Sequence, residues 1–250
     1  MNLDNAVVLL KKDTKTVYRD GDTVIKVFEE SFSKADILNE ALNHARIEET
    51  NLNIPKLKGV NMIDGKWAIF TEYIEGKTLA ELMSEDPSNF EKYLELFVDL
   101  HLIVHAQRQR LLNSLKIKTA RKIDESDLNA TIRYELQTRL QSMPKHHKVC
   151  HGDFNPSNII VSDNGPYIFD WAHASQGNAA ADAAITYLYF KLRREDEIAE
   201  SYINLYCLKS DTAKQYIMKW IPIVAATQSL RSSGDEKNLL LSWADVVEWS

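Results

Sequence analysis

The chain has 250 residues, of which 44% are hydrophobic, so it can bury a substantial core as one large domain or as two lobes. Its net charge of −6 argues against a broad nucleic-acid-binding surface, which normally carries a basic excess. Cys150 and Cys207 are too few for a disulfide scaffold and fit reduced thiols. Because the sequence shows no signal peptide and no apolar run long enough to span a bilayer, we expect a cytoplasmic protein without membrane contact.

The first part of the chain is predicted to be β-structure over residues 6–28. Apolar residues from Val7 to Leu10 and a second run at 16–18 precede Asp20-Gly21-Asp22, and a return strand follows over 23–28. Asp-Gly between β-rich runs is a strong hairpin signal. Residues 33–50 are predicted to form a helix with Ser33 as its N-cap.

Two further strands are predicted at 57–63 and 66–73, and Tyr73–Gly76 is predicted to be a connector. The remainder is predicted to be mainly helical, with a β-rich segment at 149–169 and helices over 78–84, 88–112, 125–142, 179–192, 195–207, 211–233 and 236–248. This order predicts an α+β chain of two lobes, a β-rich part over 1–73 and a helical part over 74–250.

The densest group of polar residues lies in His151–Val161. Pro156 and its polar neighbours interrupt regular structure, so Asp153 and Asn158 are expected on one tight loop. A hairpin turning at 163–166 would bring Asp170 back beside Asn158. Phosphoryl transfer needs such a set, because oxygen ligands must face a metal on the triphosphate and a further carboxylate must reach the attacking hydroxyl. The alternative is an ordinary polar loop followed by a hairpin.

The pattern His-x-Asp-x4-Asn, a short hairpin, an apolar residue and Asp resembles the catalytic core of the aminoglycoside phosphotransferase and choline kinase superfamily. These enzymes are relatives of protein kinases that phosphorylate small alcohols. The resemblance implies a single protein-kinase-like domain with two lobes. A small β-rich N-terminal lobe (1–73) would bind nucleotide, and a larger helical C-terminal lobe (74–250) would carry the catalytic loop and the acceptor site.

The resemblance also implies a role for each matching residue. Asp153 would be the catalytic base, accepting or orienting the proton of the acceptor hydroxyl, and Asn158 and Asp170 would bind Mg²⁺. His151 would hold the loop in shape, and Asp182 would support the loop from a following helix. The alternative for Asp182 is a simple helix N-cap.

The same resemblance assigns nucleotide binding to the N-terminal lobe. Lys26, in a strand between apolar residues, would contact the phosphates and pair with a helix carboxylate. Glu40 is the expected partner, with Glu48 and Glu49 as alternatives. The alternative for Lys26 itself is an ordinary residue on an edge strand or on the solvent face of the sheet.

Adenine recognition is expected at the hinge, through backbone groups near Glu72 and Ile74. The loop that should cover the phosphates is unusual, since residues 9–20 contain no glycine, whereas protein kinases use a glycine-rich loop. Thr14 and Thr16 are possible substitutes through their hydroxyl or amide groups.

Three other motif interpretations fail. Gly76-Lys77-Thr78 lacks the earlier glycine of a Walker A motif, because Thr71 stands there. The cluster at 146–151 lacks a second ligand pair at zinc spacing. Gly152 replaces the arginine of protein kinases, and the segment between Asp170 and Asp182 is too short for an activation loop.

We therefore expect a transferase of the aminoglycoside phosphotransferase type that moves the γ-phosphate of ATP, or GTP, to a hydroxyl of an aminoglycoside-like or amino-alcohol or sugar acceptor. Its partners would be Mg²⁺, a nucleoside triphosphate and a small-molecule alcohol. Two alternatives stay open: a metabolic kinase of the choline, homoserine or methylthioribose type, and a nucleotide-binding pseudokinase with a regulatory role. The sequence leaves the oligomeric state open.

Overall fold

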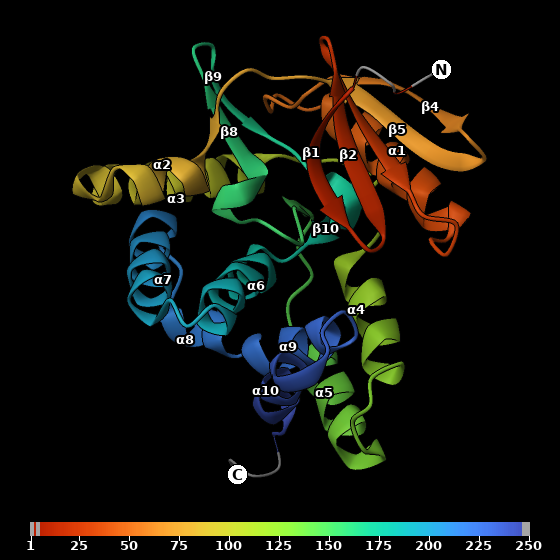
Figure 1. The fold of residues 1–250 in the computed structure, drawn as a ribbon. Helices are drawn as coiled ribbons and strands as arrows, with labels where there is room; N and C mark the ends of the chain where they lie inside the picture. The colour runs from red at the N-terminus through yellow and green to blue at the C-terminus, as the bar shows by residue number, and fades with distance from the viewer. Residues whose placement is uncertain (1–2, 4–5, 247–250) are drawn as a thin grey trace. The chain divides into compact units, whose positions relative to one another are not determined.

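The computed structural model describes residues 3 and 6–246 (Figure 1). Their contacts group the chain into two compact units. Unit 1 comprises residues 1–89 and 156–173, and unit 2 comprises residues 90–155 and 174–250. The long polar segment His151–Val161 therefore begins in unit 2 and ends in unit 1.

Unit 1 contains a five-stranded antiparallel sheet in the order β1-β2-β3-β5-β4. The strands are β1 (Val7–Lys12), β2 (Lys15–Asp20), β3 (Thr23–Phe28), β4 (Leu57–Ile63) and β5 (Lys66–Glu72). Gly21 and Gly65 have positive φ angles of 57° and 81° in the β2–β3 and β4–β5 turns of this sheet. The strands and the hairpin turns expected from the sequence are confirmed.

The two faces of this sheet bury different side chains because neighbours along a strand point to opposite faces. Ile25 and Val27 join one apolar cluster with Ile63 and Ala68. Phe28 joins the other with Ile69 and with residues of helix α1 (Lys34–Glu48). By alternation Lys26 lies on the same face as Phe28, the face that α1 covers. Ser33 occupies the N-cap position as expected, without a side-chain capping bond.

A second, three-stranded sheet of unit 1 has the order β6-β8-β9. Its elements and the short helices beside it are β6 (Lys77–Thr78), α2 (Leu79–Glu85), η1 (Pro87–Asn89), η2 (Pro156–Asn158), β8 (Ile159–Ser162), β9 (Gly165–Ile168) and η3 (Trp171–His173). Gly76 precedes β6 with φ of 156°, and a Cβ atom there would lie 2.4 Å from the carbonyl oxygen of Val161. Only glycine allows the chain to pass β8 this closely.

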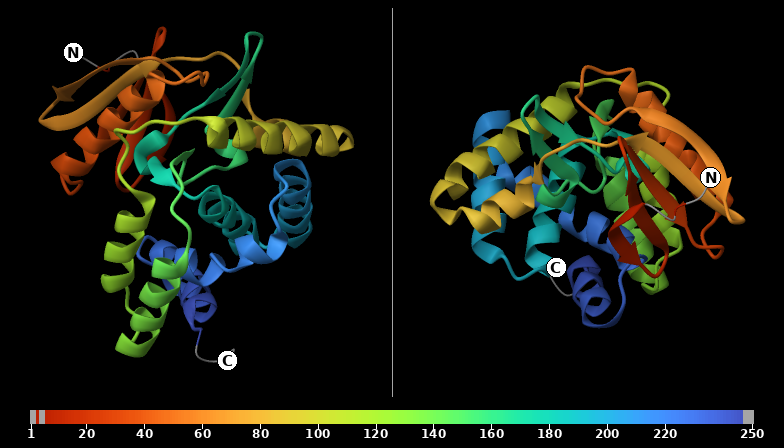
Figure 2. Two further views of the ribbon diagram at one scale, coloured as in Figure 1. Left: turned by 180° about the vertical axis from the view of Figure 1, so that it is seen from behind. Right: turned by 45° about the horizontal axis from the view of Figure 1, so that its top comes forward.

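Unit 2 is helical around a two-stranded antiparallel ladder of β7 (Lys148–Cys150) and β10 (Ser175–Gly177). Its helices are α3 (Phe90–Ala106), α4 (Leu115–Asp124), α5 (Ala130–Ser142), α6 (Ala179–Leu192), α7 (Asp196–Ser210), α8 (Lys214–Met218), α9 (Ile221–Ser229) and α10 (Gly234–Ala244). Figures 1 and 2 show α4 and α5 side by side, with α9 packed against them.

Several helix boundaries differ from the sequence prediction. The helix expected over 88–112 ends at Ala106, and α4 was not expected at all. The helix expected over 125–142 begins at Ala130, where Asn129 caps it by accepting a hydrogen bond from the Ile132 N–H. The helix expected over 211–233 is two helices, α8 and α9, and a proline stands in the first turn of α9.

The antiparallel sheet in the N-terminal part and the helices in the C-terminal part confirm the expected α+β fold class. Within the described part of the chain, no helix combines the length and the apolar character that crossing a bilayer requires.

Candidate active site

The centre of the candidate site in unit 1 is the ammonium group of Lys26. Its Nζ lies 2.5 Å from Glu40 Oε1 and 3.1 Å from Asp170 Oδ1. The Lys26 side chain is 17% exposed, so burial disfavours its charge, but the carboxylates of Asp170 and Glu40 outweigh that cost and raise its pKa. The structure thus pairs Lys26 with Glu40, rather than with Glu48 or Glu49, and the solvent-facing edge position considered for Lys26 is wrong.

A second ammonium group, which the sequence analysis missed, reaches the same carboxylate. Lys15 Nζ lies 3.6 Å from Asp170 Oδ2, and the Lys15 side chain is 19% exposed. Lys15 is the first residue of β2, directly after the glycine-free turn. Burial and the neighbouring charge of Lys26 lower the pKa of Lys15, against the pull of Asp170. A lysine beside a turn normally points into water, so the sequence carried no signal for this contact.

Asn158 and Asp170 lie at the base of the β8–β9 hairpin. Ile159 pairs with Ile168, and the backbone N–H of Phe169 donates to the carbonyl oxygen of Asn158 at 3.0 Å. The hairpin therefore brings Asp170 back beside Asn158, as the spacing predicted. Asp170 has a φ of 63°, a left-handed conformation that is uncommon outside glycine and is found where a site over-determines the backbone.

The side chains at this point suit a Mg²⁺ ion. Mg²⁺ prefers oxygen ligands and usually takes one or two carboxylates together with phosphate oxygens. Asp170 supplies a carboxylate, and Asn158, which is 9% exposed, supplies an amide oxygen from the other end of the hairpin. The donor set therefore fits a Mg²⁺ ion, which Asn158 and Asp170 would hold, and their role as ligands stays a prediction.

The loop that carries Asp153 in unit 2 is a tight polar turn. Gly152 has a φ of 80°, and the Asp153 N–H donates to His151 Nδ1 at 3.3 Å. The side-chain amide of Asn155 donates to Asp153 Oδ1, also at 3.3 Å, which orients the carboxylate. His151 is fully buried and meets the Phe154 ring edge-on, so it holds the loop from inside while the Asp153 side chain keeps partial exposure.

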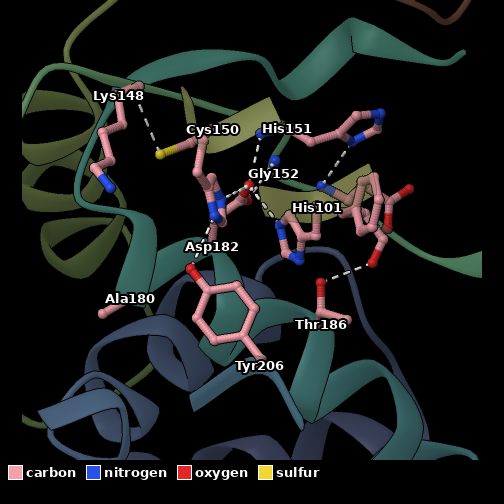
Figure 3. A network of polar contacts seen from close by, with 12 residues as sticks. His101, Lys148, Cys150, His151, Gly152, Ala180, Asp182, Thr186 and Tyr206 are labelled. Carbon is pink, nitrogen blue, oxygen red and sulfur yellow. Dashed lines mark hydrogen bonds and ion pairs between the residues drawn. The ribbon is translucent and has the colours of Figure 1, made fainter. Parts of the chain in front are cut away.

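Asp182 anchors this loop from helix α6 (Figure 3). Its carboxylate accepts backbone hydrogen bonds from His151 and Gly152, each at 2.7 Å. Asn178, and not Asp182, is the N-cap of α6, since its side chain accepts from the Ala180 N–H. The N-cap alternative for Asp182 is therefore wrong, and both oxygens of its carboxylate accept hydrogen bonds from the loop.

Two histidines of α3 complete the environment of Asp182. Nε2 of His101 and Nε2 of His105 lie 3.2 and 3.1 Å from Asp182 Oδ2. Their Nδ1 atoms lie 2.9 Å from the hydroxyl groups of Tyr202 and Tyr206. Because an ionised carboxylate can only accept, each histidine donates to Asp182 through its Nε2–H.

The charge state of this cluster follows from its burial. Burial and the neighbouring His105 lower the pKa of His101 to about 3, so His101 is neutral at physiological pH. Burial alone would raise the pKa of Asp182, but hydrogen bonds from His101 and His105 hold it well below its usual value. The buried carboxylate of Asp182 is therefore held by four N–H donors. Sequence analysis missed both histidines, although their spacing of four on an apolar helix face was visible.

At the predicted hinge, the structure shows which backbone groups are already engaged. The Glu72 N–H donates to the Lys56 carbonyl at 2.8 Å, and the Tyr73 N–H donates to the Asp22 carbonyl at 2.8 Å. Ile74 follows as a buried residue of the connector. Contact of Glu72 and Ile74 with a base stays a prediction.

Comparison with protein-family models matches residues 2–216 to a family described as the phosphotransferase enzyme family. No curated protein sequence matches the chain. Among solved structures, the apo form of a thermostable mutant of the aminoglycoside phosphotransferase APH(4)-Ia is similar with a TM-score of 0.72 at 13% identity, covering 97% of this chain and 93% of that chain.

Two choline-kinase structures are similar as well. A choline/ethanolamine kinase family protein from Mesorhizobium loti has a TM-score of 0.64 at 14% identity, covering 97% of this chain and 89% of that chain. The choline kinase LicA from Streptococcus pneumoniae has a TM-score of 0.64 at 16% identity, covering 96% and 91%. At these identities the likeness shows the fold, and the family rests on the model match over residues 2–216. The chain therefore belongs to the phosphotransferase enzyme family.

Proposed function

We propose that this small-molecule kinase transfers the γ-phosphate of Mg²⁺-bound ATP to a hydroxyl of an aminoglycoside-like, amino-alcohol or sugar acceptor. The observation that carries the proposal is the ammonium group of Lys26 between Glu40 and Asp170. A mostly buried lysine with two carboxylates is costly to build as a structural feature alone, whereas phosphoryl transfer requires a cation at the phosphates beside a metal-binding carboxylate.

Nucleotide binding is assigned to unit 1. Lys26 contacts the phosphate chain, Glu40 fixes the direction of Lys26, and the connector after β5 binds the base through backbone groups of Glu72 and Ile74. ATP is preferred as donor in this proposal, because an APH(4)-Ia mutant of the same fold has been crystallised with AMP-PNP. GTP is the alternative donor.

Asn158 and Asp170 hold the Mg²⁺ ion. When bound, the ion supplies positive charge that neutralises the triphosphate. The two residues contribute an amide oxygen and a carboxylate oxygen from the ends of one hairpin, so their separation is fixed by the pairing of β8 with β9. Asp170 Oδ1 lies 3.1 Å from Lys26 Nζ and Asp170 Oδ2 lies 3.6 Å from Lys15 Nζ, so two cations flank this carboxylate.

Asp153 is the base that takes the proton of the acceptor hydroxyl. The acceptor oxygen forms a bond to the γ-phosphorus, the bond from that phosphorus to the bridging oxygen breaks, and ADP departs with those electrons. The proton of the hydroxyl passes to the Asp153 carboxylate, which the Asn155 amide orients. Asp182 and His151 keep the loop in the conformation that this step needs.

The acceptor class is supported by neighbours of the same fold, since one is an APH(4)-Ia mutant complexed with hygromycin B and others are choline kinases. A groove of about 460 Å³ in unit 2 does not suit a polycation. Among the described residues, its lining has no carboxylate but includes Lys116, Lys145, His146 and His147. We therefore place the acceptor beside Asp153 and not in this groove.

Acceptor screening by mass spectrometry tests the proposal. The chain would be incubated with MgATP and separate acceptors: aminoglycosides, choline, ethanolamine, homoserine and methylthioribose. The proposal expects one acceptor group to gain a single phosphate. A phosphorylated choline, homoserine or methylthioribose would select the metabolic alternative, and tight nucleotide binding without any phosphorylated product would favour the regulatory alternative.

A further inference from the structure

The turn between β1 and β2 contains no glycine, yet it places one cation at the candidate site. Lys11 and Lys12 before the turn are exposed, whereas Lys15 after it is mostly buried. Lys12 and Lys15 are paired directly across β1 and β2, but Lys12 is exposed and Lys15 is not. The difference is that Lys15 Nζ reaches Asp170 Oδ2 at 3.6 Å.

The direction of Lys15 follows from the register of the sheet. Val17 pairs with Lys26, and Lys15 pairs with Phe28. Because side chains alternate along a strand, Lys15 and Lys26 emerge on the same face of the sheet. Thr16 pairs with Val27 and points to the opposite face, so its hydroxyl cannot replace the missing glycines on the face of Lys26.

The ammonium groups of Lys26 and Lys15 each contact a different oxygen of the Asp170 carboxylate. Lys26 lies 3.1 Å from Asp170 Oδ1, and Lys15 lies 3.6 Å from Asp170 Oδ2. Lys26 keeps Glu40 as a second partner, while Asp170 is the single carboxylate within salt-bridge distance of Lys15 among the described residues. When Asp170 turns its oxygens to a metal ion, Lys15 becomes a partly buried cation that needs another anion.

We propose that Lys15 binds the phosphate chain of the nucleoside triphosphate, and that its ammonium group replaces the backbone amides that a glycine-rich loop supplies. A glycine-rich loop works by bringing backbone N–H groups close to phosphates. In a turn without glycine, the side chains keep the backbone N–H groups farther from the phosphates. The long, flexible side chain of a lysine can cover that distance. This inference rests on the proposed function, because it deepens the nucleotide site of that function.

Substitution of Lys15 tests the inference by nucleotide binding. Binding of MgATP and of adenosine would be measured by calorimetry for wild type and for Lys15→Met, Lys15→Arg and Lys12→Met. Lys15→Met is expected to weaken MgATP about 10- to 100-fold, as loss of a charge-assisted hydrogen bond predicts. It is expected to leave adenosine binding unchanged. Lys15→Arg should recover most of the affinity, and Lys12→Met should match wild type.

The other outcomes are separable. If Lys15→Met binds MgATP as well as Lys12→Met does, or more tightly, Lys15 only shields Asp170 and the inference is overturned. Equal loss of MgATP and adenosine would point to a distorted lobe and would also overturn it; thermal unfolding of each variant checks this. If wild type binds no nucleoside triphosphate at all, the proposed function itself fails.

Discussion

The carboxylate of Asp182 accepts a 2.7 Å hydrogen bond from the backbone N–H of His151, 31 residues earlier in the chain. The same carboxylate also receives the Gly152 N–H and two imidazole N–H groups. A loop that must present Asp153 in one orientation is thus fixed by a charged group at its base, and not by regular secondary structure. Removing that charge should affect both stability and turnover.

Asp182→Asn is expected to lower the free energy of unfolding by about 3 kcal/mol, because the amide places an N–H where the carboxylate accepted N–H groups. Activity should fall with it. Urea unfolding measures the loss. Asp235→Asn is the matched control, since Asp235 also lies in the first turn of a helix but is exposed. Equal losses in the two variants would show that the Asp182 network does not hold the fold.

The lowered pKa of the buried His101 predicts that the free energy of unfolding depends on pH. Its pKa falls from 6.5 to about 3 on folding, so between these values the unfolded chain binds a proton that the folded chain does not. Stability therefore rises with pH in this window, and lowering the pH from 6.5 to about 4.5 should cost about 2–3 kcal/mol through this group.

Urea unfolding across this pH range tests the assignment. His101→Gln keeps a donor for Asp182 but cannot titrate, so its stability should depend less on pH than that of wild type. His147→Gln, at an exposed position, should retain the wild-type slope. A wild-type slope in His101→Gln would mean that His101 is not the group responsible.

Asp153→Asn tests the assigned base. The change is isosteric and leaves the loop anchored by Asp182, so the unfolding temperature should stay close to wild type. Turnover should fall on the order of a hundredfold or more, the usual cost of losing a general base. Asp163→Asn in the exposed turn of the β8–β9 hairpin serves as control. Full activity in Asp153→Asn would remove that residue from the mechanism.

Glu40→Gln tests whether the Glu40 carboxylate positions Lys26 for nucleotide binding. Loss of the 2.5 Å ion pair should leave Lys26 less well directed and lower kcat/KM for ATP by roughly tenfold, the effect of weakening one charge-assisted contact. Steady-state kinetics with varied MgATP would measure it. Asp36→Asn, an exposed acid on the same helix, should be neutral. Unchanged kinetics in both variants would contradict the role of Glu40.

Gly76→Ala tests the close passage of the connector beside the hairpin that carries Asn158 and Asp170. The added Cβ would lie 2.4 Å from the Val161 oxygen, so β6 and β8 would have to separate. The cost should be about 2 kcal/mol or more in unfolding free energy. Gly59 has nearly the same φ, 155° against 156°, with open space around it, so Gly59→Ala is the matched control. Equal costs would show that backbone strain alone, and not the close approach, matters.

The parts of the site that the sequence predicted were those set by local pattern. The β8–β9 hairpin follows from its turn at 163–166, and Lys26 was predicted to bind phosphate because its strand position was combined with the motif downstream. Lys15 was missed because its partner Asp170 is distant in sequence and a lysine beside a turn usually faces water. His101 and His105 were missed because their common partner, Asp182, lies 81 and 77 residues further along.

The helix boundaries show a similar limit. Helix α4 buries Leu115, Thr119 and Ile123, which recur every four residues along an otherwise polar helix, so its helical periodicity was present in the sequence. The segment after Ala106 has no glycine or proline to mark the end of α3, so the predicted helix ran on to 112. The end of α3 thus has no local marker, whereas α4 carries local signals that the prediction overlooked, namely the N-cap Ser114 and the spacing of its buried residues.

The most direct test of the central claim is a coupled assay of ADP release with MgATP against the acceptor panel, with Asp153→Asn as the blank. The account predicts acceptor-dependent ADP release in the wild-type chain that disappears in the blank and in the absence of Mg²⁺. Release that is identical in wild type and Asp153→Asn, or no nucleotide binding and no release with any acceptor, would contradict it.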